Sequence, residues 1–150
     1  MDFILEERVE KACDLFRQGY NCSQSVFLAY NDLLGVESTL AATISGPLGG
    51  GMGRLREVCG ALSGIFLAAG LLYGYTAPGD DQAKAAHYAR IQALAGAFRR
   101  ENGAILCREL LGLASKELSP EPTPRTAEFY RKRPCGDLVY QAASLLEELG

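Results

Sequence analysis

Apolar residues recur at helical spacing along most of the chain, and the first such stripe ends at Gly19. This stripe comprises Leu5, Val9, Ala12, Cys13 and Phe16. Asn21 is a favourable N-cap for a second helix, which we expect to extend to Leu34. Its apolar face comprises Cys22, Val26, Ala29 and Leu33. We expect Ser38 to cap a short third helix that ends at about Ile44.

Glycines interrupt this pattern between residues 46 and 54, where a regular helix or strand interior is not expected. An apolar helix over about Glu57–Tyr73 should follow this loop and occupy the centre of a bundle. Gly60, Gly64 and Ala68 are spaced by four, so another helix can approach one of its faces closely. The uncharged run over residues 58–79 is long enough to span a bilayer. Its many glycines and the lack of a basic flank favour a buried helix over a membrane span.

The second half of the chain predicts a long helix from Asp80 to about Arg100, then a shorter one from Ala104 to Leu111. A proline-rich surface connection follows over residues 119–124. A final helix after Pro134 carries an apolar face that comprises Leu138, Ala142, Leu145 and Leu149. No segment alternates with the period of a strand. We therefore predict one domain over residues 1–150, an all-α bundle of about five to seven helices.

The chain's 150 residues carry a formal net charge of −3, with 48% hydrophobic and 22% charged residues. These values are ordinary for a globular protein, and the acidic balance argues against a nucleic-acid or membrane-surface partner. The first residues lack the basic start and apolar core of a secretory signal, so we expect a cytoplasmic location. Cysteines in that compartment more often bind metal or perform redox chemistry than form structural disulfides.

Four of the five cysteines lie at predicted helix starts, and these are Cys22, Cys59, Cys107 and Cys135. A helix N-terminus carries partial positive charge that stabilises a thiolate. Cations also flank these positions in the sequence, namely Arg54 and Arg56, Arg108, and the basic run Arg131, Lys132 and Arg133. Cys13 instead lies within the first apolar stripe, where a cysteine is ordinarily a small buried hydrophobe. The four helix-start cysteines are therefore the candidate reactive residues.

Other interpretations of these residues remain open. The sequence has no C-x-x-C pair, so spacing alone does not indicate a zinc site unless the helix starts converge in space. All four cysteines could also be buried structural residues. The glycine loop with Arg54 could hold an anion, pack its backbone against Cys59 or move to admit a substrate. His87 is expected at the edge of the core with Ile91, with a place beside the thiols as the alternative.

The ordered cysteine motifs resemble a family of small bacterial and archaeal redox-active proteins known as C_GCAxxG_C_C. The matching segments are Asn21-Cys22-Ser23-Gln24-Ser25-Val26, Gly49-Gly50-Gly51-Met52-Gly53, Cys59-Gly60-Ala61-Leu62-Ser63-Gly64, Cys107-Arg108-Glu109-Leu110-Leu111-Gly112 and Arg133-Pro134-Cys135. The resemblance covers about residues 5 to 145. The family label places a glycine before the central cysteine, whereas Val58 precedes Cys59-Gly60-Ala61 in this sequence. The resemblance implies four functional cysteines and leaves Cys13 outside the pattern. It implies no particular substrate.

We therefore expect thiol–disulfide or electron-transfer chemistry at a four-cysteine cluster, as in a thiol–disulfide oxidoreductase. Cys59 is the expected primary thiolate and Cys22 its partner, with Cys107 and Cys135 as a second pair. One alternative is that the same four residues bind an iron–sulfur cluster or zinc. Another is an anion-binding or sensor protein with inert cysteines. The expected partner is a redox protein or a small thiol or disulfide, and the abundant small apolar residues suit a homodimer.

Overall fold

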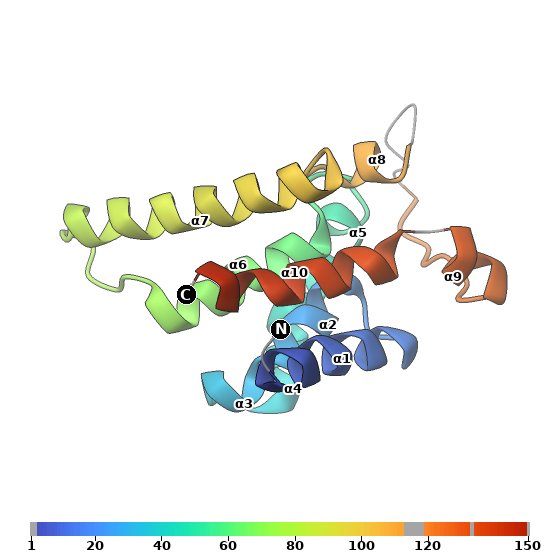
Figure 1. Ribbon diagram of the computed structural model, residues 1–150, viewed down its shortest axis with the longest axis horizontal. Coiled ribbons are helices and arrows are strands. Elements are labelled where there is room, and N and C mark those ends of the chain that lie inside the picture. Colours follow the sequence, from blue (N-terminus) through green and yellow to red (C-terminus); the bar gives the residue numbers. More distant parts are fainter. Residues whose placement is uncertain (1–2, 113–118, 133, 150) are drawn as a thin grey trace.

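Helices form nearly all the regular structure of the protein. The computed structural model describes residues 3–112, 119–132 and 134–149 (Figure 1). Its elements are α1 (Phe3–Arg17), α2 (Cys22–Ala29), α3 (Asn31–Leu34), α4 (Ser38–Ser45), the 3₁₀ turn η1 (Gly46–Leu48), α5 (Gly49–Met52), α6 (Gly60–Tyr73), α7 (Asp81–Asn102), α8 (Cys107–Leu110), α9 (Ala127–Lys132) and α10 (Cys135–Leu149). Within these ranges six helices have eight or more residues, and no strand is present. The predicted all-α fold is confirmed.

The helices form three layers around α6. Figure 1 shows α7 along the top, α6 and α10 across the middle, and α1 to α4 below them. α6 packs against α2, α7 and α10, and α10 also packs against α1. Buried apolar side chains from all of these helices join one hydrophobic cluster. The expectation that the apolar helix after the glycine loop lies at the centre is therefore confirmed.

The glycine-lined face of α6 receives α2, as its spacing predicts. A Cβ added at Gly64 would lie only 2.6 Å from the Ser23 carbonyl oxygen and 3.1 Å from Cβ of Val26. Only glycine permits this approach of the two backbones. Among the described residues, no helix is both long enough and apolar enough to cross a membrane.

The predicted second helix is broken at Tyr30, which takes the non-helical dihedral angles φ −97° and ψ 1°. Its buried ring projects to α10, where the hydroxyl donates a hydrogen bond to the Ala143 carbonyl oxygen. Because the chain turns here, Leu33 leaves the expected apolar face and is 55% exposed. Glu37, rather than the predicted Ser38, caps α4, since its carboxylate accepts hydrogen bonds from the next helix turn.

Two helices begin later than predicted because the segments before them pair with each other. The Cys59 backbone N–H donates to the Ile105 carbonyl oxygen at 2.8 Å, and the Cys107 N–H donates to the Glu57 carbonyl oxygen at 2.6 Å. These bonds flank an isolated antiparallel bridge between residues 58 and 106. They hold the starts of α6 and α8 side by side. The sequence pattern also missed α9, a single helical segment of six residues.

Candidate functional site

All four candidate cysteines lie at the start of a helix. Cys22, Cys107 and Cys135 are the first residues of α2, α8 and α10, and Cys59 is the N-cap of α6. The predicted positions are therefore confirmed at all four sites. Backbone N–H groups at a helix start have no intrahelical partner, and those of Ala61 and Leu62 donate to the Cys59 sulfur. At the start of α8, by contrast, the N–H groups of Cys107 and Arg108 donate to the Glu57 and Arg56 carbonyl oxygens.

The four cysteines line one small, partly enclosed space, which we call the inner cavity. Its volume is about 30 Å³, room for about one water molecule. Its remaining lining residues are Gly50, Arg56, Gly60, Leu110, Leu111 and Leu138. The fold thus brings together side chains from four separate helices and up to 113 sequence positions apart, since Cys22 and Cys135 are the outermost pair. Cys13 does not line this cavity, and it is half-buried on α1.

Two glycines make the close packing around these sulfurs possible. A Cβ at Gly60 would collide with the Cys22 sulfur and lie 2.9 Å from the Leu48 carbonyl oxygen. A Cβ at Gly51 would lie 2.6 Å from Cβ of Cys107, and Gly51 also has a left-handed φ of 75°. The backbone of the glycine loop therefore packs against Cys107. The sequence had suggested that it packs against Cys59.

Burial dominates the electrostatics of two of these thiols. It raises the pKa of Cys59, and the nearby Cys22 sulfur raises that pKa further, while backbone hydrogen bonds at Leu62 and Ala61 oppose the shift. Burial likewise raises the pKa of Cys22, against a smaller opposing effect of the Gly50 backbone N–H. The expected lowering of the Cys59 pKa is wrong, because its side chain is nearly buried and burial raises that pKa. Arg56 donates a hydrogen bond to Cys107, and Arg54 donates to the proline-rich segment.

Among the described side chains, Arg56 donates a hydrogen bond to one of these sulfurs, that of Cys107. Its side chain is 3% exposed, and Nη1 donates a hydrogen bond to Sγ of Cys107 at 3.5 Å. Arg54 and Arg56 both have left-handed φ angles, 65° and 61°, which are uncommon for residues other than glycine. Such backbone strain concentrates at functional sites. Arg108 instead donates to the Glu57 carboxylate at 3.2 Å.

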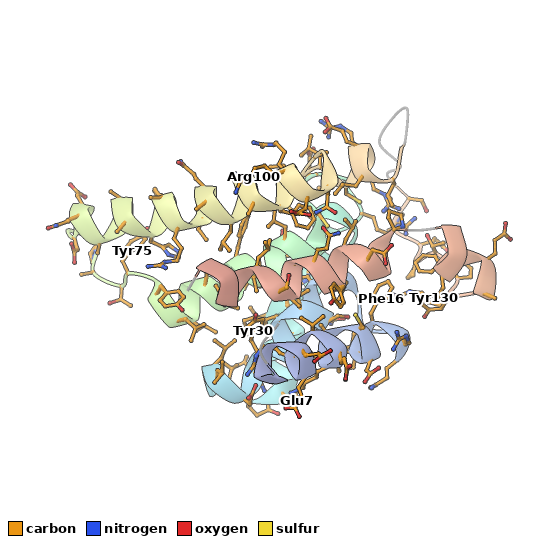
Figure 2. All side chains as sticks on the ribbon, in the orientation of Figure 1. Glu7, Phe16, Tyr30, Tyr75, Arg100 and Tyr130 are labelled. Carbon is orange, nitrogen blue, oxygen red and sulfur yellow. The ribbon has the colours of Figure 1, made fainter. Side chains whose placement is uncertain are left out.

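The basic run before Cys135 was also predicted to lie near a thiol. The side chains of Arg131, Lys132 and Arg133 lie outside the described residues, as do those of Leu5 and Leu149. His87, by contrast, is placed clearly. It packs against Tyr75 with ring centroids 6.1 Å apart, at the end of α7 remote from α8 (Figure 2). The alternative that His87 lies beside the thiols is therefore wrong.

A second, larger space of about 320 Å³ adjoins the inner cavity, and we call it the outer pocket. Its described lining residues are Phe16, Asn21, Cys22, Gly46, Gly49, Gly50, Gly53, Arg54, Arg56, Pro120, Pro122, Thr123, Arg125, Phe129 and Cys135. Cys22 and Cys135 line both spaces, whereas Cys59 and Cys107 line only the inner cavity. A ligand in the outer pocket would therefore lie nearer to Cys22 and Cys135 than to the other two cysteines.

The proline-rich segment forms one wall of the outer pocket and is held from both sides. Arg54 of the glycine loop donates to the Ser119 carbonyl oxygen at 3.0 Å and to the Thr123 hydroxyl at 2.9 Å. Arg125 donates to the carbonyl oxygens of Phe16, in the last turn of α1, and Tyr20, just beyond α1, at 2.9 and 3.1 Å. These bonds hold residues 119–125 over the first residues of α2 and α10.

Arg125 is a site residue that the sequence pattern did not single out. Its guanidinium stacks 4.2 Å from the Phe16 ring centroid, and Figure 2 shows Phe16 beside Tyr130, with ring centroids 6.0 Å apart. The only signal in the sequence was a lone cation directly after three prolines. That signal does not indicate which carbonyl groups the side chain would reach.

Four thiolates are a suitable donor set for zinc or an iron–sulfur cluster. In residues 3–112, 119–132 and 134–149, however, no three His, Cys, Asp or Glu side chains are grouped closely enough to hold a metal ion. The five cysteines are thiols in this structure. The arrangement therefore gives no geometric support to the metal-centre alternative.

The fold and site define an all-α protein whose sulfurs gather where several helices begin. The family model described as "Putative redox-active protein (C_GCAxxG_C_C)" matches residues 20–149, so the chain belongs to this family. The resemblance of the cysteine motifs to that family is thereby confirmed. No curated protein and no solved structure matches the chain.

Proposed function

We propose that the protein performs thiol–disulfide exchange with two cysteine pairs, Cys22 with Cys59 and Cys107 with Cys135. The observation that carries this proposal is the common lining of one inner cavity of about 30 Å³ by all four residues. Each proposed pair joins one cysteine that also lines the outer pocket to one that lies only at the inner cavity. An outer thiol can then meet a substrate while its inner partner stays shielded.

The pairing rests on the neighbours of each sulfur. After burial, the Cys22 sulfur is the neighbour that raises the Cys59 pKa most, and Cys107 also raises the pKa of both Cys59 and Cys22. The Cys22 sulfur also occupies the space that a Cβ at Gly60 would need. Cys107 and Cys135 remain as the second pair, with Arg56 donating to Sγ of Cys107. A cation at that sulfur stabilises the negative charge that exchange generates there.

The reaction consists of two successive exchanges. The outer thiol loses its proton and attacks one sulfur of a substrate disulfide, which forms a mixed disulfide and releases the first substrate thiolate. The inner thiol then loses its proton and attacks the protein's sulfur in that mixed disulfide, which releases the second thiolate. The two protons neutralise the two thiolates. The protein pair is oxidised by two electrons and the substrate disulfide is reduced to two thiols.

Burial of Cys22 and Cys59 disfavours a thiolate in the resting protein but does not disfavour a disulfide between them. Because burial raises the pKa of Cys22 and Cys59, both stay protonated at neutral pH. A disulfide is neutral and needs no solvation of charge, so oxidation leaves no buried ion behind. We therefore expect the reduced pair to react slowly with simple alkylating reagents, yet to form a disulfide readily once one exchange has begun.

A thiol count with metal analysis tests the proposal. The protein is purified without oxygen and reduced, and its thiols are counted before and after oxidation with 2-hydroxyethyl disulfide. We expect five thiols in the reduced protein, in accord with its five cysteines, and loss of four of them on oxidation. Cys13→Ser is the matched control and should reduce the first count by one and leave the loss unchanged.

The same preparation tests the metal-binding alternative. We expect a colourless protein without stoichiometric iron or zinc. Visible absorbance with bound iron, or zinc bound at one equivalent and lost in the Cys22→Ser variant, would contradict the dithiol proposal. So would an unchanged thiol count after oxidation, which would indicate inert cysteines as in the sensor alternative.

A further inference from the structure

The outer pocket has a composition that selects a particular chemistry. We infer that it binds small disulfides that carry carboxylate groups, and that it presents their sulfur–sulfur bond to Cys22 or Cys135. This inference rests on the proposed function, because it names the substrate class of the same cysteines. It assigns a binding role to the arginines and the proline-rich wall.

Charge is the first argument for this substrate class. Three arginines, Arg54, Arg56 and Arg125, line the outer pocket, and its described lining residues include no aspartate or glutamate. The hydrogen bonds of Arg125 go to the Phe16 and Tyr20 carbonyl oxygens and to the Tyr130 hydroxyl, all of which are uncharged. Its guanidinium therefore keeps its positive charge for an incoming anion, and arginine is well suited to hold a carboxylate.

Size is the second argument. A volume of about 320 Å³ lies at the lower end of the range for small-molecule sites, about 300–1,000 Å³. Hydrogen bonds from Arg54 join the proline-rich wall to the glycine loop, and a hydrogen bond from Arg125 joins it to the last turn of α1. A partly open pocket of this volume with one anchored wall suits a small disulfide better than an extended segment of a partner protein.

Position is the third argument. The outer pocket reaches sulfur only at Cys22 and Cys135 among the described lining residues. The same pocket is lined by arginines and by one cysteine of each proposed pair, Cys22 and Cys135. A ligand whose carboxylate binds an arginine there would have its disulfide bond near one of these two cysteines. Exchange then follows the same two steps, with the anionic disulfide as oxidant and two carboxylate-bearing thiols as products.

A matched series of three disulfides tests the inference on the unmodified protein. The reduced protein is mixed with 3,3′-dithiodipropionate, which is anionic, with neutral 2-hydroxyethyl disulfide, or with cationic cystamine, and thiol loss is followed in time. We expect the second-order rate constant to be at least about tenfold higher for the anion than for the neutral compound, and lowest for the cation. Added salt should reduce this difference. Equal rate constants for all three compounds would overturn the inference.

Variants locate the effect in the pocket. Arg54→Gln and Arg125→Gln, made separately, should each lower the ratio of the anionic to the neutral rate constant by about threefold or more. Arg100→Gln is the control, because Arg100 projects from the outer layer formed by α7 and lines neither space (Figure 2). It removes the same charge and should leave the ratio unchanged. An equal fall in the control variant would show general electrostatics and overturn the assignment.

An inert analogue separates this inference from the proposed function. 3,3′-Thiodipropionate has the same two carboxylates but no disulfide bond, so calorimetric titration measures its binding without any exchange. We expect it to bind the unmodified protein, more weakly in high salt, and to lose affinity in Arg54→Gln. Binding without thiol loss in the disulfide series would contradict the proposed function alone. Thiol loss with the neutral disulfide but no binding of the analogue would contradict only the pocket's assignment.

Discussion

Single residues set how closely the sulfurs meet, and glycine matters there as much as cysteine. Gly60 leaves the space that the Cys22 sulfur fills, and Gly51 lets the loop backbone reach Cys107. The sequence predicted that α6 has a face bare enough for close approach. It did not predict that burial would raise the pKa of Cys59, because desolvation depends on which side chains the rest of the chain folds over that sulfur.

Two glycine substitutions on α6 should have opposite effects. Gly60→Ala places a methyl group against Cys22 and the Leu48 carbonyl oxygen, so we expect a loss of about 1–3 kcal/mol in the free energy of unfolding. Gly70→Ala meets no atom within 4 Å and should increase stability by about 0.5–1 kcal/mol through helix propensity. Urea unfolding of the reduced proteins measures both. Equal effects of the two substitutions would contradict the packing described here.

The raised pKa of Cys59 also predicts a pH dependence of stability. Because the folded pKa lies above that of the unfolded chain, the folded state binds more protons at alkaline pH. The stabilisation is fully present below about pH 8.5, the ordinary cysteine pKa, and is lost as the pH rises further toward the folded value. Urea unfolding under reducing conditions at pH 7 and pH 10 should show a larger loss for the unmodified protein than for Cys59→Ala. Identical losses would contradict burial of this thiol.

At the scale of elements, the site lies where the first residues of α2, α6, α8 and α10 come together around the inner cavity. Sequence patterns located the starts of α2 and α10, because N-caps and helix breakers act locally. They placed α6 and α8 three residues too early, since the pairing of residues 57–59 with 105–107 is a long-range contact. The two arginine attachments of residues 119–125 are long-range in the same way, and no local pattern specifies them.

The cap of α2 should control both stability and the reactivity of Cys22. The Asn21 side chain accepts from the Gln24 N–H and donates to the Gly46 carbonyl oxygen at 3.0 Å, which ties α2 to the glycine loop. We expect Asn21→Ala to cost about 1 kcal/mol in unfolding free energy and to speed alkylation of Cys22. Asp80→Ala is the control, because Asp80 caps α7 through Ala83 in an exposed position.

Mass spectrometry of alkylated peptides measures the rate at each cysteine in these two variants. Both variants lose a side-chain N-cap hydrogen bond, but only Asn21 lies beside Cys22 and the glycine loop. Unchanged alkylation of Cys22 in Asn21→Ala, or an equal rise in the control, would show that the cap does not govern access to the sulfur.

At the scale of the whole molecule, the fold gathers sulfurs that no sequence motif places together. The all-α class and the central position of α6 followed from periodicity alone, because those depend on local pattern and on which helix is most apolar. The division into an inner cavity and an outer pocket did not, because it depends on how the glycine loop and the proline-rich segment meet across the bundle. That division is what gives each proposed cysteine pair one accessible and one shielded member.

Peptide mapping of the oxidised protein examines the convergence of the four sulfurs most directly. The reduced protein is oxidised with 2-hydroxyethyl disulfide, blocked, digested without reduction and sequenced by mass spectrometry. We predict cross-linked peptides that join Cys22 to Cys59 and Cys107 to Cys135 within one chain, with Cys13 recovered in blocked form. Links only between chains, links that involve mainly Cys13, or four blocked cysteines with no link among them would contradict the account.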